Sequence, residues 1–402
     1  MNMVSPEIIE FDEIVPKFIP EDDFDHEVAR MLYYDKKKRI FIEFPSSVNS
    51  YNYVIRSNGY IGYIPLNEKY SLKIKPKVVI TNIFRMLEYA YNLKRFEFLE
   101  GTLAIDSIED IYERLANILS KRIIDRNRKG LFRDYVQHTE RLPYFRGRVK
   151  IVPTVLSLLR GSLRIECDYQ EHTAEVEDNQ ILTWVLFQLR RFNFQREEVK
   201  RNNRRAYREL INKVGLRQVE PRDCINRFYH RLNQDYKPMH GLCRFFLENC
   251  GPGLEMGEFD FIPFVIHMPT LFESFVAEWL RLNLPPEYKI RIQFRTQLDS
   301  EGRFSFQIDL VLLEASTGTV LGILDTKYKR NPDPAGDDIQ QIVAYAVSME
   351  TKNAYLIYPS AITRNVDFII GNNIRIRSLT FDLGQDPEIA GQEFIKTLLR
   401  DR

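Results

Sequence analysis

The chain has 402 residues, of which 44% are hydrophobic and 28% are charged. This length exceeds what one compact core usually holds, and this composition excludes a disordered chain, so we expect a globular protein of two or three domains. Lysine and arginine number 57 against 56 aspartate and glutamate, so the net charge of +1 excludes a global basic excess as the means of binding a polyanion.

Four cysteines lie at irregular spacings: Cys167, Cys224, Cys243 and Cys250. The first residues are acidic and do not have the basic and apolar pattern of a secretory signal, so we expect reduced thiols and a cytoplasmic protein. His230 and His240 lie near the last two cysteines and offer a zinc site as the alternative to buried thiols. No apolar run reaches the roughly 18 residues that a transmembrane helix needs, so we expect no contact with a membrane.

Residues 1–105 alternate short strand-like runs with turn signals such as Ser57-Asn58-Gly59, which predicts a β-rich N-terminal module. Residues 106–250 are rich in arginine and follow mainly helical periodicity, which predicts a helical middle region. The glycine and proline cluster CGPGLEMGEFDFIPF then marks the next boundary.

Residues 265–402 alternate helices and strands. A helix is predicted to begin at Pro269-Thr270 with the threonine as its cap. Strands follow at 288–298, 304–314 and 320–329, then a helix at 337–350 and a strand at 353–359. This order predicts an α/β domain with a mixed sheet, and the whole chain is therefore expected to be a multidomain α/β (α+β) protein.

Two of these predicted strands carry charged residues that burial should exclude. Asp309 interrupts an apolar run, and Asp325 and Lys327 lie two residues apart on the next strand, so they face the same side. Oxygen ligands of this kind favour Mg²⁺ or Mn²⁺, which would polarise a phosphodiester and activate water. The alternative is a solvated salt bridge at the strand ends, worth about 0–1 kcal/mol.

Two helices place further polar residues beside this space. Glu273 lies at the margin of the apolar stripe of its helix, and Gln341 and Tyr345 share one helix edge with Asp338. These positions suit residues that reach a metal or a phosphate. The alternatives are a boundary glutamate facing water and a solvated helix edge.

The order of these polar residues resembles that of the PD-(D/E)xK nuclease superfamily, with a last element like its RecB-type branch. The matching residues are Glu273, Asp309, Asp325-Thr326-Lys327, and Gln341 to Tyr345. Ile308 stands where a proline often precedes the first aspartate. The resemblance implies a restriction-endonuclease-like domain in which the three carboxylates hold Mg²⁺, Lys327 aids the attack of water, and Gln341 and Tyr345 shape the phosphate side.

Outside this domain, three segments resemble the McrC family: GYIGYIPLNEKYSLKIKPKV near the start, YFRGRVKI, and CDYQEHTAEVEDNQILTWVL. The likeness covers most of the chain. It implies the Mg²⁺-dependent endonuclease subunit of a type IV, McrBC-type restriction system, which cleaves DNA containing modified cytosine. It also implies a McrB-like AAA+ GTPase hexamer as partner, with the N-terminal module docking on the ring and stimulating its GTPase.

No G-x-x-x-x-G-K-[ST] motif is present, so we expect GTP to be bound by the partner and not by this chain. Five arginines of the middle region are candidates for tracking the backbone of double-stranded DNA: Arg190, Arg191, Arg201, Arg204 and Arg205. The alternative is a solvated helix face, because Glu197 and Glu198 dilute the charge.

Because one active site cuts one strand, a transient dimer of nuclease domains is also expected. Two other functions stay open. The chain could serve a related GTP-driven system that reads an unmodified sequence, or it could be a non-cleaving adaptor that activates the ring.

Overall fold

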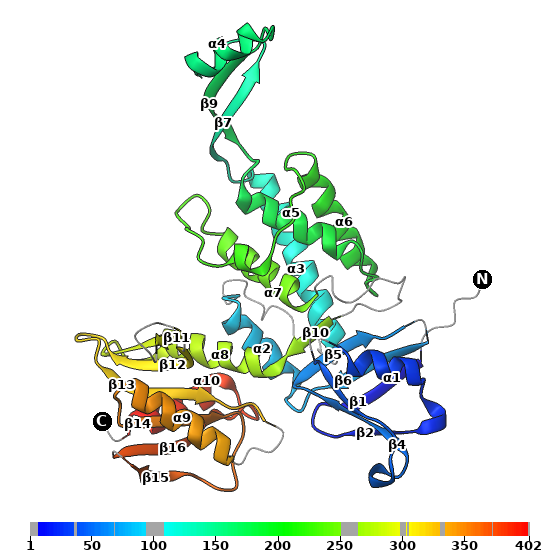
Figure 1. Ribbon diagram of the computed structural model, residues 1–402, viewed down its shortest axis with the longest axis vertical. Helices are drawn as coiled ribbons and strands as arrows, with labels where there is room; N and C mark the ends of the chain where they lie inside the picture. Colours follow the sequence, from blue (N-terminus) through cyan, green and yellow to red (C-terminus); the bar gives the residue numbers. More distant parts are fainter. Residues whose placement is uncertain are drawn as a thin grey trace. The chain divides into compact units, whose positions relative to one another are not determined.

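The computed structural model describes residues 7–35, 38–67, 69–93, 108–250, 264–297, 303, 305–329, 334–371 and 373–400 (Figure 1). The chain forms two compact units: unit 1 combines Met1–Ile111 with Pro252–Arg402, and unit 2 is Tyr112–Gly251. The described residues form ten α-helices and four β-sheets. This confirms the predicted multidomain α/β class.

The first part of unit 1 contains two small sheets. A three-stranded antiparallel sheet has the order β2-β4-β3, formed by Lys17–Pro20, Asn52–Ser57 and Ile40–Glu43. A four-stranded sheet, which we call the N-terminal sheet, has the order β1-β6-β5-β10, formed by Glu7–Asp12, Tyr70–Lys75, Tyr60–Pro65 and Phe264–His267. Buried side chains of both sheets share one core with helix α1 (His26–Tyr33).

Strand β10 follows the middle region in the sequence and pairs antiparallel with β5, with Val265 opposite Gly62. Gly62 has a φ of +116°, and a Cβ there would collide with the carbonyl oxygen of Phe264, so the close approach requires glycine. The predicted domain boundary at residue 265 therefore lies inside a strand of the N-terminal sheet.

The second part of unit 1 is a mixed six-stranded sheet with the order β11-β12-β13-β14-β16-β15 (Figure 1). In that order the strands are Tyr288–Gln297, Ser305–Glu314, Val320–Thr326, Asn353–Tyr358, Ile374–Thr380 and Asp367–Ile370. Strands β11 to β13 pair antiparallel, whereas β13, β14 and β16 pair parallel. Helix α9 (Gly336–Ser348) makes the crossover between the parallel strands β13 and β14, as the predicted alternation requires.

Helix α8 (Met268–Asn283) connects β10 to this sheet, and α2 (Ile80–Ala90) packs against α8. Trp279 of α8 is completely buried, and Gly391 of α10 (Pro387–Leu399) leaves room for its ring. The predicted cap at Thr270 is wrong. His267 is the N-cap and Pro269 lies in the first turn, where its missing N–H leaves no helical hydrogen bond unmade.

Unit 2 contains most of α3 (Ile108–Lys129) together with α5 (Glu177–Leu189), α6 (Glu197–Ile211) and α7 (Tyr236–Asn249). The helical prediction for this region is incomplete, because unit 2 also holds a three-stranded antiparallel sheet. Its order is β7-β9-β8, formed by Asp134–Leu142, Ile165–Thr173 and Arg148–Val149. No residue of β7 is buried, so the strand lacks the apolar alternation that predicts a half-buried strand.

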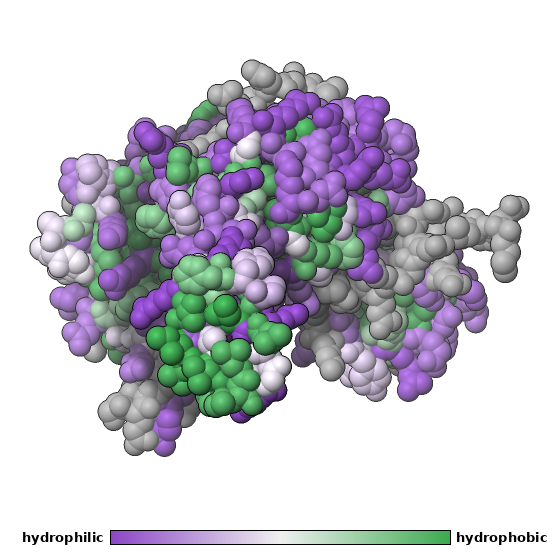
Figure 2. Space-filling model, turned by 90° about the horizontal axis from the view of Figure 1, so that it is seen from above, coloured by the Kyte–Doolittle hydropathy of each residue, from purple (hydrophilic) through white to green (hydrophobic). Residues whose placement is uncertain are grey.

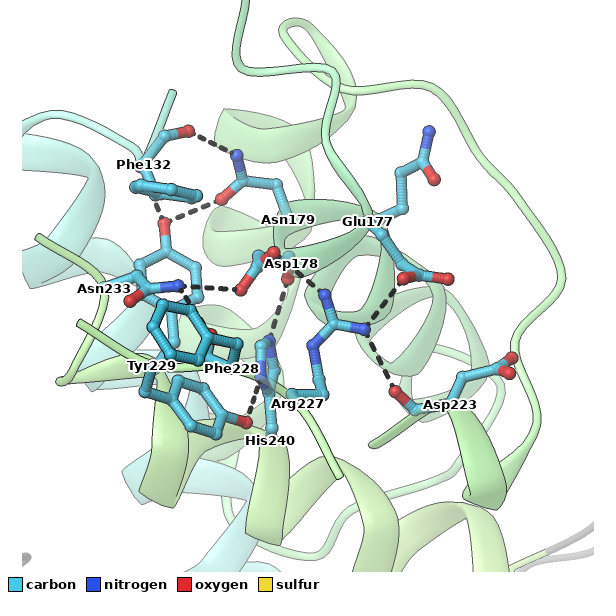
Figure 3. A network of polar contacts seen from close by, with 12 residues as sticks. Phe132, Glu177, Asp178, Asn179, Asp223, Arg227, Phe228, Tyr229, Asn233 and His240 are labelled. Carbon is cyan, nitrogen blue, oxygen red and sulfur yellow. Dashed lines mark hydrogen bonds and ion pairs between the residues drawn. The ribbon is translucent and has the colours of Figure 1, made fainter. Parts of the chain in front are cut away.

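A buried polar network joins the helices of unit 2 (Figure 3). Asn179 is fully buried and accepts a hydrogen bond from the Tyr236 hydroxyl at 2.7 Å. Asp178 pairs with Arg227 at 2.9 Å, and its backbone carbonyl lies 3.0 Å from His240 Nε2. Because buried polar groups are costly without partners, these bonds fix how α5 and α7 pack.

Helix α4 (Ile151–Leu159), which lies between β8 and β9, exposes its apolar side chains. Its only buried residues are the polar Thr154 and Ser157. We define the apolar tip as the following exposed residues: Ile151, Val152, Val155, Leu156, Leu158, Leu159 and Leu163. Figure 2 shows a compact hydrophobic patch at this end of unit 2. None of the described helices is both long and apolar enough to cross a membrane.

Candidate active site

Two predicted site residues, Asp309 and Asp325, lie where the pairing of β12 with β13 ends. Strands β12 and β13 run antiparallel with Leu310 opposite Leu324, so Asp309 and Asp325 are the next residues on either strand. Asp309 Oδ2 accepts hydrogen bonds from the backbone N–H and the hydroxyl of Thr326, each at 3.1 Å. The structure therefore brings the two carboxylates together.

Asp325 is only 2% exposed. Its Oδ2 forms an ion pair with Lys327 Nζ at 2.6 Å, and no hydrogen bond of good geometry reaches this oxygen from the residues that the structure describes. Burial and the charge of Asp309 raise the pKa of Asp325 to about 6, against the opposing effect of Lys327. A buried carboxylate oxygen held only by charge is a position that suits a cation.

Lys327 is held by residues of helix α9. Its Nζ donates a hydrogen bond of 2.8 Å to Gln341 Oε1 and lies 3.7 Å from Asp338 Oδ1. Burial lowers the pKa of Lys327, but the charges of Asp325 and Asp338 outweigh burial, so the pKa is raised and the ammonium stays charged. Gln341 Nε2 in turn donates to the Tyr345 hydroxyl at 2.8 Å. This bond orients the amide so that its oxygen faces Lys327.

Glu273 of α8 completes what we call the carboxylate cluster (Glu273, Asp309 and Asp325). Burial, then the charges of Asp309 and Asp325, raise the pKa of Glu273 to about 7. Gln293 Nε2 donates to Glu273 Oε1 at 3.3 Å. Glu273 is half-buried, so the alternative of a boundary glutamate facing water stays open beside its prediction as a site residue.

Gln293 is a site residue that the sequence analysis missed. It lies in β11 between two residues that pair with Leu310 and Ile308, which places it across from Asp309. Its φ of 47° is in the left-handed region, which costs a residue with a side chain about 1–3 kcal/mol and is typical of functional sites. No feature of the alternating run around Gln293 marks this conformation.

On the edge of α9 that carries the predicted polar residues, Asp338 and Tyr345 are buried, with 3% and 8% exposure, whereas Gln341 between them is exposed, so the alternative of a solvated edge holds only for Gln341. Asp338 accepts hydrogen bonds from Lys329 Nζ at 2.6 and 2.7 Å and from the backbone N–H of Ala335 at 3.1 Å. Both lysines of the strand end therefore approach Asp338. The sequence analysis placed Asp338 on this edge but did not include it among the predicted catalytic or metal-binding residues.

The carboxylate cluster fits a divalent cation in charge and in donor type, because Asp309 raises the pKa of both other members and all three offer oxygen ligands. Within the described residues, no three acidic, histidine or cysteine side chains converge closely enough to hold a metal as they stand. Lys327 Nζ takes the place beside Asp325. The role of the cluster as a metal site stays a prediction.

The zinc alternative in unit 2 does not fit its residues. Both ring nitrogens of His240 have partners, since Nδ1 lies 2.8 Å from the Tyr229 hydroxyl and Nε2 contacts the carbonyl of Asp178 (Figure 3). The four cysteines are free thiols, and burial raises the pKa of Cys243 well above its ordinary value. A zinc ligand must instead be a neutral imidazole nitrogen or a thiolate.

The five predicted DNA-binding arginines are all exposed. Arg205 pairs with Glu209 at 2.8 Å, and the Arg190 guanidinium lies 4.4 Å from the ring centre of Tyr207. Glu197 beside them pairs with Lys200 at 2.9 Å. DNA binding by these arginines stays a prediction.

Comparisons with known proteins agree with the resemblance seen in the sequence. Residues 55–359 match the family model described as McrBC 5-methylcytosine restriction system component. A relative from Escherichia coli (strain K12), the type IV methyl-directed restriction enzyme EcoKMcrBC, is 22% identical over 335 residues, which cover 80% of this chain and 95% of the relative.

Among solved structures, a half-complex of Thermococcus gammatolerans McrB AAA+ hexamers with bound McrC contains a chain of similar fold. The TM-score is 0.56 at 17% sequence identity, and the match covers 98% of this chain and 100% of that one. The shared fold, together with a family model that spans most of the sequence, identifies the chain as a member of the McrC family of McrBC 5-methylcytosine restriction system components.

Proposed function

We propose that this protein is the nuclease subunit of a McrBC-type restriction system and that it hydrolyses phosphodiester bonds of double-stranded DNA with Mg²⁺. The observation that carries the proposal is the carboxylate cluster at the strand ends, with Lys327 held between Asp325 and Gln341. Burial and the charge of Asp309 raise the pKa values of Asp325 and Glu273, and perturbed carboxylates of this kind are typical of active sites.

In this proposal Asp309, Asp325 and Glu273 would hold Mg²⁺, with Mn²⁺ as an alternative; the chemistry supplied at this site would be polarisation of a phosphoryl oxygen and activation of water. Lys327 places a positive charge where negative charge develops on the phosphate. Gln341 and Tyr345 orient Lys327 through the chain of hydrogen bonds described above.

The partner is a McrB-like AAA+ hexamer, by analogy with the complex from Thermococcus gammatolerans. GTP would be bound and hydrolysed by this partner. Exposed apolar patches on soluble proteins mark contacts with other proteins. The apolar tip of unit 2 therefore supports a second contact with the ring, in addition to the one made by the N-terminal module. Stimulation of the partner's GTPase, a transient nuclease dimer and a cytoplasmic location belong to the same proposal.

The decisive experiment combines the protein with its AAA+ partner, GTP, Mg²⁺ and plasmid DNA with or without 5-methylcytosine. Asp325→Asn is expected to abolish cleavage and to leave GTP hydrolysis by the complex unchanged, because Asp325 belongs to the carboxylate cluster and lies in the sheet interior. Cleavage that persists in Asp325→Asn would refute the site.

The same assay separates the alternatives. GTPase stimulation without any cleavage by the wild-type complex would favour a non-cleaving adaptor. Equal cleavage of both plasmids would favour a system that reads an unmodified sequence.

A further inference from the structure

The residues that follow Asp325 are held from two sides. Lys327 and Lys329 both approach Asp338, as described above. Tyr328 between them donates a hydrogen bond of 3.1 Å from its hydroxyl to Glu13 Oε2. Glu13 follows strand β1, so the strand end beside the candidate active site contacts the N-terminal sheet.

Lys77, which follows β6, makes the second contact with this strand end. Its Nζ donates a hydrogen bond of 2.8 Å to the carbonyl oxygen of Lys329 and lies 3.9 Å from the ring centre of Tyr328. Its backbone N–H donates to Glu13 Oε2 at 3.4 Å. We call Glu13, Lys77 and Tyr328 the clamp.

The clamp residues Glu13 and Tyr328 are buried. Glu13 and Tyr328 are 7% and 9% exposed, and burial raises the pKa of Glu13 and lowers that of Lys77. Buried charges of this kind are tolerated only with partners at short distance, so loss of one partner leaves the others unsatisfied. The backbone N–H of Glu13 also donates to the carbonyl of Lys75 at 2.8 Å, which continues the pairing of β1 with β6.

The clamp acts on the same short segment that carries the candidate catalytic lysine. The backbone N–H of Lys327 donates to the carbonyl of Ile357 at 2.8 Å and so extends the pairing of β13 with β14. Beyond this bond the segment is held by the ion pair of Lys329 with Asp338 on one side and by the clamp, through Tyr328 and the carbonyl of Lys329, on the other. The clamp is therefore one of two supports for the residues that follow Lys327.

We propose that Glu13 and Lys77 are positioning residues for DNA cleavage: by holding Tyr328 and Lys329 they keep Lys327 in place and connect the N-terminal sheet to the active site. This inference rests on the proposed nuclease function. A clamp that serves only as a structural anchor would hold the segment without any effect on the chemical step, and the experiment separates these two cases.

The variants are chosen to disturb the clamp and little else. Lys77→Met removes the cation and keeps the length of the side chain, Lys77→Arg keeps the cation, and Tyr328→Phe removes one oxygen. A cavity of about 480 Å³ lies beside Glu13, Lys77 and Tyr328, so a shortened side chain opens into existing space. Lys75→Met is the matched control. Lys75 is the last residue of β6, two residues before Lys77, and it pairs with Glu10 at 3.0 Å in an exposed ion pair.

The first measurement is hydrogen–deuterium exchange of the metal-free protein, read in peptides that contain the Lys327 amide. We expect exchange to become about tenfold faster in Lys77→Met, with a smaller effect in Tyr328→Phe and none in Lys75→Met, because opening this amide requires release of the strand end. Exchange at the wild-type rate in both clamp variants would overturn the inference.

The second measurement is the single-turnover rate of cleavage by the complex with its AAA+ partner, GTP and plasmid DNA containing 5-methylcytosine. Lys77→Met should lower this rate about tenfold, because small displacements of a catalytic group carry penalties of this size. The Mg²⁺ concentration at half-maximal rate should not change, and Lys77→Arg should restore most of the rate.

Faster exchange with undiminished cleavage would leave the clamp as an anchor and overturn its positioning role. Absence of cleavage by the wild-type complex would instead overturn the proposed function, and the positioning role with it. These two failures are distinguishable because the first requires an active wild-type complex.

Discussion

Replacing Glu273 with glutamine is expected to stabilise the metal-free protein at pH 8 and to leave its stability at pH 4.5 nearly unchanged. Burial and the charges of Asp309 and Asp325 raise the pKa of Glu273 from 4.5 to about 7. A carboxyl group with a higher pKa in the folded than in the unfolded protein favours folding while it is protonated. Its contribution is therefore present at low pH and is lost as the pH rises from about 4.5 to about 7.

The magnitude follows from the size of this shift. One pKa unit corresponds to about 1.4 kcal/mol, and the partial exposure of Glu273 to solvent reduces the effect, so we expect roughly 1–2 kcal/mol at pH 8. For a unit of this size that energy corresponds to a rise in melting temperature of roughly 2–6 °C. Glutamine keeps an oxygen that can accept the hydrogen bond from Gln293, so little else is lost.

The assay is calorimetric unfolding in EDTA at both pH values, with Glu278→Gln as the control. Glu278 lies on the same helix, but it pairs with Arg281 at 2.6 Å, so its loss should bring no gain at pH 8. Added Mg²⁺ should then raise the melting temperature of the wild type at pH 8 more than that of Glu273→Gln. An equal shift of Glu273→Gln at the two pH values, or its destabilisation at pH 8, would refute the claim that these carboxylates repel one another.

Three further outcomes are expected. Tyr345→Phe removes the acceptor of the Gln341 amide and should lower single-turnover cleavage about tenfold at unchanged half-saturating Mg²⁺, whereas an unchanged rate would show that the amide needs no such support. Burial lowers the pKa of His240 to about 4, so the free energy of unfolding of unit 2 should fall by about 3 kcal/mol as the pH falls from 6.5 to 4. Proteolysis of the wild type should therefore be faster at pH 5 than at pH 7, and His240→Gln should abolish this difference. Val152→Lys combined with Leu159→Lys should weaken binding to the AAA+ ring in gel filtration without lowering the melting temperature, because both side chains are exposed, and full binding would exclude the apolar tip as a contact.

The C-terminal sheet could be predicted because its central strands are short apolar runs and because one helix separates two of them. The same runs revealed Asp309 and Asp325, since a charge inside a buried strand is improbable without a role. Gln293 gave no such signal. Its left-handed backbone arises from the geometry of β11 against β12, and a glutamine in an alternating strand is otherwise ordinary.

Unit 2 shows the opposite limit of sequence reasoning. Strand β7 carries polar side chains on both faces and buries none of them, so it lacks the period of two on which strand prediction depends. In α4 the apolar run from Ile151 to Leu159 would ordinarily indicate a core helix, yet it buries Thr154 and Ser157 instead. A surface shaped for another protein carries the same residue types as a core, and only the structure tells the two apart.

The ion pair between Lys327 and Asp325 explains how the chain tolerates its buried charges before DNA is bound. A cation at Asp325 would compete with the Lys327 ammonium for the same oxygen, so Lys327 must then be held by its other partners. Gln341 is already at 2.8 Å and Asp338 at 3.7 Å, and Asp338 is itself held by Lys329. The clamp fixes Lys329 from the other side, so release of Lys327 from Asp325 can proceed without movement of the strand end. Under the proposed function, Lys327 would neutralise the site when no cation is bound and would act on the phosphate when one is.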